Sequence, residues 1–323
     1  MRRFLLRSGT VMVILVAVAV VVGFGIRDKN SASALRVTQQ STLPATAQGY
    51  LGVYTPTMPE STDGLSAFET KTGTRPNVAV YYSGWLEPFQ TQFAGELARR
   101  GMVPLVQIDP EGISLSSIVD GKYNSYLATF AQSVRSFGHP VIVSFGHEMN
   151  GNWYSWGNGT TSPVTFVAAW QHLVKVFRSN GASNVTWLWT INSVVGGPGP
   201  AASPQPWWPG TSYVNWVGVD GYFYYKSETF GTLFGQTIAA IRHFTRDPVL
   251  ITETAAAPAA GQAAKIQELF AGARSAGMLG VVWFDDGGYR DWVIDNDPAA
   301  LAAFGQAAQG FGGAVLPPAD VPD

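Results

Sequence analysis

Eight short segments rich in apolar and β-branched residues recur along the chain, and their order constrains the fold more than any other feature. They lie at residues 50–54, 77–82, 102–108, 140–145, 185–191, 216–222, 249–252 and 279–284. Stretches with apolar residues at helical spacing separate most of them, at 88–100, 123–137, 163–179, 229–245 and 261–276. The fifth connection is rich in Gly and Pro, which favours a long irregular loop. Eight strands alternating with helices predict an α/β fold, a closed (β/α)8 TIM barrel.

Composition limits the number of domains and the kinds of partner. The 323 residues are 46% hydrophobic and 13% charged, which is enough for one large core. We predict one barrel domain at 49–310, followed by a flexible tail at 311–323. The chain from residue 35 onward carries 15 basic and 21 acidic side chains, so it is a poor nucleic-acid binder. Cysteine is absent, which excludes disulfides and thiolate catalysis.

The N-terminal segment predicts export. Arg2, Arg3 and Arg7 precede an uncharged apolar run at 8–26, an arrangement that leaves the N-terminus in the cytoplasm and places the remainder outside. We predict a signal anchor at 1–30, because the apolar run is long; a cleaved signal peptide stays open, because 32–34 offers a small-residue cleavage site. Residues 31–48 read as a flexible linker. The expected location is extracytoplasmic, with the membrane as a partner.

Two carboxylates follow predicted strands. Glu148 lies in the segment 144–157 (SFGHEMNGNWYSWG), directly after the fourth strand, and Glu253 ends the seventh. The carboxyl ends of all strands in such a barrel converge on one face, so the two side chains can meet in one cleft. Paired carboxylates are what glycoside hydrolysis requires, and a separation of roughly 5 Å predicts retention of anomeric configuration. The alternative for Glu253 is a structural carboxylate that caps the following helix.

The run 147–157 resembles the acid/base signature of glycoside hydrolase family 26, the β-mannanase family of retaining (β/α)8 glycosidases. Further similarities occur at 216–222, 248–253, 283–285 and 291–292, so the resemblance spans residue 50 to about 297. The resemblance implies that Glu148 is the general acid/base, Glu253 the nucleophile, His147 a neighbour in the substrate site, Tyr222 a donor to the nucleophile and Trp153 a sugar platform. The family often has Arg four residues before the acid/base, where this chain has Ser144.

Other polar and aromatic residues are candidates for contacts with sugar. Asn150, Trp156, Trp283 and Asp285 are predicted to bind substrate, with Asp286 an alternative and ordinary turn chemistry a competing interpretation of both aspartates. Asp220 is expected to hydrogen-bond backbone or Tyr222. The tryptophans that qualify as platforms are Trp85, Trp153, Trp156, Trp207, Trp208 and Trp283.

The sequence therefore predicts a retaining hydrolase that cleaves internal β-linkages of a polysaccharide, with β-1,4-mannan as the leading substrate. Mixed-linkage glucan or xylan stays open, and so does a catalytically silent glycan-binding barrel on the cell surface. We expect no cofactor, and the four histidines show no metal-binding spacing. A monomer is favoured, although the sequence leaves the oligomeric state open.

Overall fold

The computed structural model describes residues 43–195, 201–288 and 290–318. The predicted membrane segment at 1–30, most of the predicted linker and the last five residues lie outside these ranges. Within them, no helix combines the length and the apolar character that crossing a bilayer requires.

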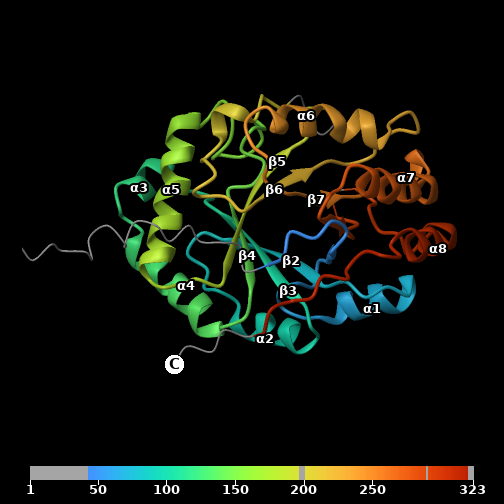
Figure 1. Cartoon of the computed structure of the whole chain (residues 1–323), viewed down its shortest axis with the longest axis horizontal. Helices are drawn as coiled ribbons and strands as arrows, with labels where there is room; N and C mark the ends of the chain where they lie inside the picture. Colours follow the sequence, from blue (N-terminus) through green and yellow to red (C-terminus); the bar gives the residue numbers. More distant parts are fainter. Residues whose placement is uncertain (1–42, 196–200, 289, 319–323) are drawn as a thin grey trace, which may run out of the picture. The chain divides into compact units, whose positions relative to one another are not determined.

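Eight parallel strands close into a barrel in chain order, with β1 hydrogen-bonded to β8 (Figure 1). This confirms the predicted fold, and each strand lies within two residues of its predicted bounds. The strands are β1 (Tyr50–Tyr54), β2 (Val78–Gly84), β3 (Val103–Asp109), β4 (Val141–Phe145), β5 (Val185–Asn192), β6 (Trp216–Asp220), β7 (Val249–Thr254) and β8 (Gly280–Phe284).

Helices surround the strands, and the five predicted helical segments are all present. Segment 229–245 is split between a π-helical turn at Gly231–Gly235 and a short α-helix. Three further helices, α1, α3 and α8, were not predicted. The α-helices are α1 (Asp63–Thr72), α2 (Thr91–Arg99), α3 (Leu115–Val119), α4 (Asn124–Phe137), α5 (Pro163–Ser179), α6 (Gln236–Arg242), α7 (Gln262–Ser275) and α8 (Pro298–Ala307).

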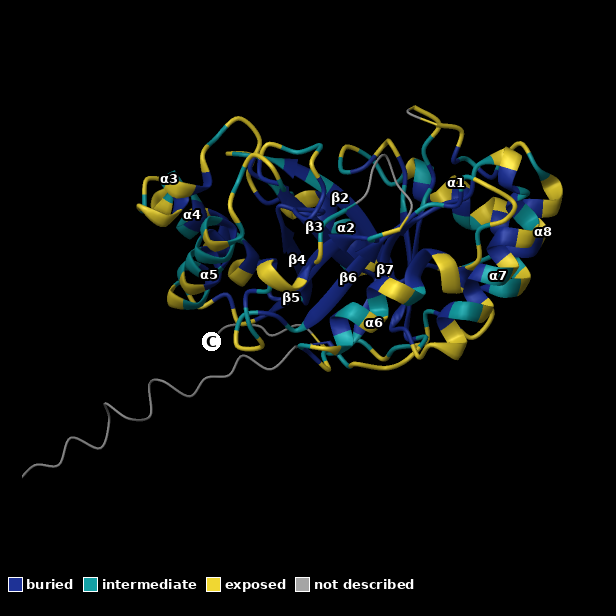
Figure 2. Cartoon of the chain, turned by 90° about the horizontal axis from the view of Figure 1, so that it is seen from above, coloured by how far each residue is buried: buried dark blue, intermediate teal, exposed yellow. Residues whose placement is uncertain are grey.

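The core has two layers, because every strand is buried on both faces (Figure 2). The outer layer packs the strands against the helices. The inner layer fills the barrel with side chains such as Tyr50, Leu105, Ile142 and Trp216. The rings of Tyr50 and Trp216 lie 4.9 Å apart near the amino ends of their strands. A lumen filled in this way leaves the carboxyl ends of the strands as the place for a pocket.

We call the end of the barrel at the amino ends of the strands its floor. Two segments cover this floor, one that precedes the predicted domain in the sequence and one that follows it. Leu43 is 2% exposed and joins the inner core layer, against which Ala314 and Leu316 also pack. Backbone hydrogen bonds add to this, from Gln48 N–H to the Met278 carbonyl and from Ala314 N–H to the Gly49 carbonyl. Residues 43–48 and 311–318 are therefore part of the packed structure.

Candidate active site

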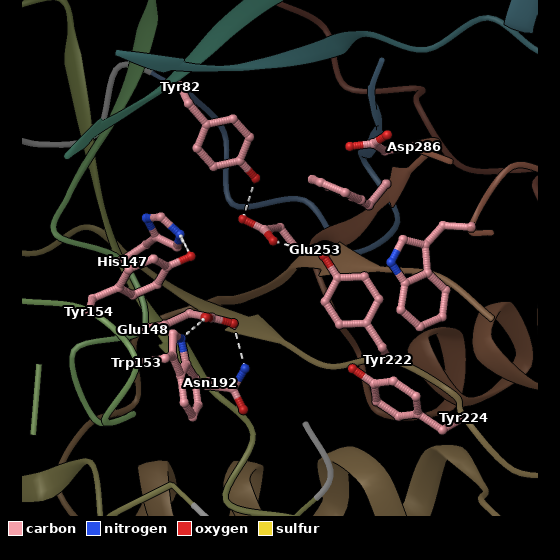
Figure 3. Close-up of a pocket in the computed structure, with 12 residues that line it drawn as sticks. Tyr82, His147, Glu148, Trp153, Tyr154, Asn192, Tyr222, Tyr224, Glu253 and Asp286 are labelled. Atoms are coloured by element: carbon pink, nitrogen blue, oxygen red, sulfur yellow. Dashed lines mark hydrogen bonds between the residues drawn. The ribbon is translucent and has the colours of Figure 1, made fainter. Parts of the chain in front are cut away.

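A cavity of about 400 Å³ opens at the carboxyl ends of the strands (Figure 3). This is the size range of small-molecule sites. Aromatic and acidic side chains dominate its lining, which consists of Tyr82, His147, Glu148, Trp153, Tyr154, Asn192, Tyr222, Tyr224, Glu253, Phe284, Asp286 and Trp292.

The turn after β4 places Glu148 in this cavity. Glu148 has a backbone φ of 53°, and Gly146 a φ of 54°. Few residues other than Gly adopt this left-handed conformation, and those that do concentrate at functional sites. A side chain at Gly146 would also be crowded, since a Cβ would lie 3.1 Å from Phe166 and 3.2 Å from Trp156. The N–H of Glu148 donates to the carbonyl of Thr190 at 3.0 Å, which ties the turn to β5.

Both carboxyl oxygens of Glu148 accept a hydrogen bond. The indole Nε1 of Trp153 donates to Oε2 at 2.7 Å, and the amide of Asn192 donates to Oε1. Burial, followed by the negative charge of Glu253, raises the pKa of Glu148 to about 7; His147 and the two donors oppose this rise. Glu148 can therefore hold a proton near neutral pH and release it to a bound group.

A bulge in β7 turns Glu253 toward the same cavity. Leu250 lies in the inner core layer and Ile251 in the outer one, so strict alternation would point residue 253 outward to the helices. The register with β6 and β8 shifts at this point, and Glu253 becomes the partner of Asp220. Bulges commonly re-aim a side chain in this way next to active sites.

Two phenols donate to the Glu253 carboxylate. The hydroxyl of Tyr82, on β2, lies 2.5 Å from Oε1, and the hydroxyl of Tyr222, just after β6, lies 2.9 Å from Oε2. The side chain of Glu253 is therefore hydrogen-bonded inside the pocket and does not cap the following helix. The predicted link between Tyr222 and Glu253 is present, and Tyr82 supplies a second one.

His147 lines the pocket between two partners. Its Nδ1 lies 2.9 Å from Asp109 Oδ1, and its Nε2 lies 3.1 Å from the Tyr154 hydroxyl. Burial by itself lowers the pKa of His147, but the charge of Asp109 and the hydrogen bond to it, with Glu253 and Glu148, raise it to about 9. The imidazole is therefore a cation at neutral pH, and it offsets part of the negative charge in the pocket.

Asp220 is a third carboxyl group beside the two glutamates. It is fully buried. The sequence predicts a bond to backbone or to Tyr222, and the backbone of Glu253 supplies a hydrogen bond to the Asp220 carboxyl group. Burial, together with the charges of Glu253 and Glu148, raises the pKa of Asp220 well above its usual range. The raised pKa of Asp220 favours its neutral form, which limits the negative charge beside the two glutamates.

Four residues predicted to bind substrate do not line the pocket. Trp283 is fully buried and packs outward on Phe304, and Asp285 accepts the N–H of Ile294. Trp156 stacks on Tyr154 from behind, with ring centroids 4.4 Å apart. The side-chain amide of Asn150 donates to the backbone carbonyl of Asn192 at 2.8 Å, and its oxygen accepts the backbone N–H of Asn192 at 2.9 Å. Asn150 therefore positions a residue that holds Glu148 instead of facing the cavity.

The remaining candidate tryptophans also lie elsewhere. Trp207 is buried against Phe166, Trp208 lies 5.1 Å from Trp189, and Trp85 packs on Tyr123. Trp153 is the one predicted platform that lines the pocket, among the residues described. Ser144 is buried, and its hydroxyl lies 3.0 Å from that of Thr190. The position at which the similar family often has an Arg is thus taken by Ser144, whose hydroxyl pairs with that of Thr190.

The pocket contains six residues that were not predicted as site residues, and also Asp286, which was the predicted alternative to Asp285. Tyr82, Asn192 and Phe284 lie at or near the carboxyl ends of their strands. Their position in the chain could therefore have predicted that they face the pocket. Tyr154 lies inside the sequence motif itself. The others are Tyr224 and Trp292. Within the described ranges, no three His, Asp or Glu side chains gather closely enough to hold a metal ion.

The model of "Glycosyl hydrolase family 26" matches residues 114–266, a stretch that includes both glutamates. Over this stretch the chain is similar to glycosyl hydrolase family 26. Endoglucanase H of Acetivibrio thermocellus is 28% identical to this chain over 273 residues, which cover 80% of the chain and 30% of that protein. "Beta-1,3-xylanase TXYA" of a Vibrio species is 25% identical over 174 residues, 50% of the chain and 36% of that protein.

The chain thus spans about a third of the length of these curated relatives. Among solved structures, a modular endo-β-1,4-mannanase from Cellulomonas fimi is similar, with a TM-score of 0.64 and 17% identity over 84% of the chain and 75% of that structure. At this identity the likeness supports the (β/α)8 fold. The matched family is one of glycosidases. The linkage and the substrate have to be argued from the residues of the site.

Proposed function

We propose that the protein is a retaining glycoside hydrolase that cleaves internal β-linkages of a polysaccharide. The observation that carries the proposal is the pair Glu148 and Glu253, which line one pocket in different surroundings. Glu148 is buried beside a negative charge, which raises its pKa to about 7 and favours the protonated acid. Glu253 accepts two phenolic hydrogen bonds, which orient it as a carboxylate nucleophile.

In this mechanism one oxygen of Glu253 attacks the anomeric carbon of the sugar that stays bound. As the glycosidic bond breaks, the proton of Glu148 moves to the leaving oxygen, and a covalent glycosyl-enzyme forms. Glu148, now a carboxylate, takes a proton from water. That water attacks the anomeric carbon and frees Glu253, so the product keeps the β configuration.

The substrate is the finer part of the proposal. The resemblance to β-mannanases and the mannanase from Cellulomonas fimi favour β-1,4-mannan. A β-glucan is the second candidate, because the relative named endoglucanase H matches 80% of the chain. We further propose that the enzyme acts outside the cytoplasm, a location supported by the basic and apolar residues at 2–26.

The test replaces each glutamate separately. Glu148→Gln and Glu253→Gln are expected to lower kcat on the preferred polysaccharide by about 10³-fold or more while leaving the circular dichroism spectrum unchanged. Glu96→Gln on α2, which does not line the pocket, is the matched control and is expected to keep the wild-type rate. Wild-type rates in both pocket variants would sink the proposal.

A panel of mannan, mixed-linkage glucan and xylan identifies the substrate. Early products, read by NMR before mutarotation, are expected to be β anomers. Early α product would contradict the double displacement. Binding without release of reducing sugars would instead indicate a silent glycan-binding barrel.

A further inference from the structure

The charged side chains of the barrel are divided unequally between its two ends. Six helices lead directly into a strand, and their last turns, with the connections to those strands, lie at the floor, because each helix runs antiparallel to the strands. These segments contain nine basic and three acidic side chains, at 69–77, 96–102, 134–140, 176–184, 239–248 and 272–279. The connections that follow the strands, at the pocket end, contain three basic and 11 acidic side chains. The floor is therefore the basic end of an acidic domain.

Arginines provide most of the positive charge at the floor. Arg100 is paired with Glu69, and Arg178 and Arg242 are half-buried. Five others are exposed, and none of them forms an ion pair with a described residue: Arg75, Arg99, Arg135, Arg246 and Arg274. Their guanidinium groups can bind an anionic partner without first breaking an internal ion pair.

Stabilisation of the helices accounts for only part of this pattern. A base in the last turn offsets the negative end of the helix dipole, and α2, α4, α5, α6 and α7 each have an arginine there. Arg75 lies three residues after the end of α1, and Arg246 lies four residues after the end of α6. The dipole effect falls off within the last turn, so the helices do not explain these two charges.

The chain enters the described domain at this same end. Leu43 packs into the inner core layer at the floor. The apolar run at 8–26, from which we predict a signal anchor, is separated from Leu43 by 16 residues, which can span at most about 55 Å. An anchor inserted in a bilayer therefore keeps Leu43, and with it the floor, within that distance of the lipid. A membrane is the anionic partner that the sequence brings within reach of these arginines.

We propose that the floor docks on a membrane surface that contains anionic phospholipids. A guanidinium matches the oxygens of a phosphate group, and each base held near an anionic bilayer strengthens the attraction. The acidic pocket end is repelled by the same surface, so the docked barrel holds its pocket at the end remote from the lipid. This interaction goes beyond the proposed function and does not depend on it, because no residue of the pocket takes part.

The test uses the full chain in vesicles of phosphatidylcholine, alone or in an equal mixture with phosphatidylglycerol. The sequence contains no cysteine, so Ser275→Cys at the floor and Ser227→Cys at the pocket end each provide a single labelling site, and both positions are exposed. Energy transfer from the label to an acceptor lipid reports how close that end lies to the bilayer. Transfer from position 275 is expected to rise with phosphatidylglycerol and to fall again in high salt. Transfer from position 227 is expected to stay low.

Two charge-matched pairs of substitutions identify the residues that dock. Arg75→Gln with Arg246→Gln removes two charges from the floor and is expected to lower the equilibrium constant for docking by roughly tenfold or more. Lys122→Gln with Lys226→Gln removes two charges from the pocket end and is expected to leave that constant unchanged. All four side chains are exposed, so both variants are expected to keep the wild-type circular dichroism spectrum.

Equal transfer from position 275 in the two lipids, or equal losses in the two variants, would overturn the docking face. If the N-terminal segment does not insert, co-sedimentation of the full chain with the same vesicles decides. Salt-sensitive binding that requires phosphatidylglycerol then supports the proposal, and equal binding to both vesicles refutes it. Binding to polygalacturonate but to neither vesicle would show that the floor recognises an acidic glycan and not a lipid.

Discussion

At the scale of single residues, burial and the charge of Glu253 raise the pKa of Glu148 and so set the pH range in which it can act as an acid, while its N–H donors oppose the rise. A pKa raised to about 7 means that the proton stays on Glu148 through mildly acidic pH and is lost as the pH rises through that value. We therefore expect kcat to fall on the alkaline side of about pH 7. Trp153 opposes the rise in pKa, because its indole N–H stabilises the ionised form.

Trp153→Phe removes that donor and keeps an aromatic ring in the pocket. The pKa of Glu148 is expected to rise further, so the alkaline limb of the pH profile of kcat moves to higher pH. Steady-state rates at saturating substrate measure this separately from any change in KM. Trp208→Phe, outside the pocket, serves as the control. A limb that stays in place or moves to lower pH would contradict the role of the indole.

Tyr82 gives a second prediction at this scale. Tyr82→Phe removes one donor to Glu253 and retains the ring that packs edge-on against Tyr54 at 5.2 Å. Loss of one oriented donor is expected to lower kcat by about 10- to 100-fold with little change in stability. Tyr81→Phe is the matched control, because Tyr81 faces the helices and packs on Phe93. Equal rates in the two variants would show that Tyr222 alone holds the nucleophile.

At the scale of elements, the sequence predicts the strands well and their faces poorly. Residues 279–284 were recognised as a strand, but both faces of a barrel strand are buried, so no alternation of polar and apolar residues shows which side chain faces inward. Trp283 was predicted to bind substrate, whereas its neighbour Phe284 lines the pocket. Just after the strand, Asp286, the predicted alternative to Asp285, lines it. Glu148, His147 and Trp153 were found because the motif around them is distinctive. Glu253 faces the pocket through a bulge that no local pattern indicates.

The contact between β1 and β8 closes the barrel, and it depends on a glycine. Gly280 pairs with Tyr50, and a Cβ at Gly280 would lie 1.9 Å from the Tyr50 carbonyl oxygen. Gly280→Ala must push the two strands apart and is expected to lower the free energy of unfolding by about 3 kcal/mol or more. Urea denaturation measures the loss.

The same substitution on a helix is the control for this prediction. Gly95 lies within α2, and a Cβ there meets nothing within 4 Å. Gly95→Ala is expected to stabilise the protein by up to about 1 kcal/mol, because alanine is the better helix former. If the two variants were equally stable, barrel closure would not depend on close approach at Gly280.

At the scale of the whole molecule, the segments that cover the floor of the barrel join the two ends of the described domain to its inner core. Leu43→Ala removes a buried side chain there and is expected to cost about 2 to 3 kcal/mol of unfolding free energy. Activity at low temperature should stay near the wild-type value, because the floor lies away from the pocket. Leu86→Ala, at a position 59% exposed, is expected to change stability by less than about 0.5 kcal/mol. Equal losses in the two variants would show that Leu43 adds nothing to the core.

The placement of Leu43 and Leu316 on the floor also bears on how the enzyme can be attached to other objects. Both residues pack on the inner layer near the amino ends of the strands, whereas Glu148 and Glu253 lie at the carboxyl ends. A bead, an electrode coating or a fused binding module joined next to either residue would leave the open mouth of the barrel facing outward. A long polymer could then reach the glutamates without threading past its point of attachment.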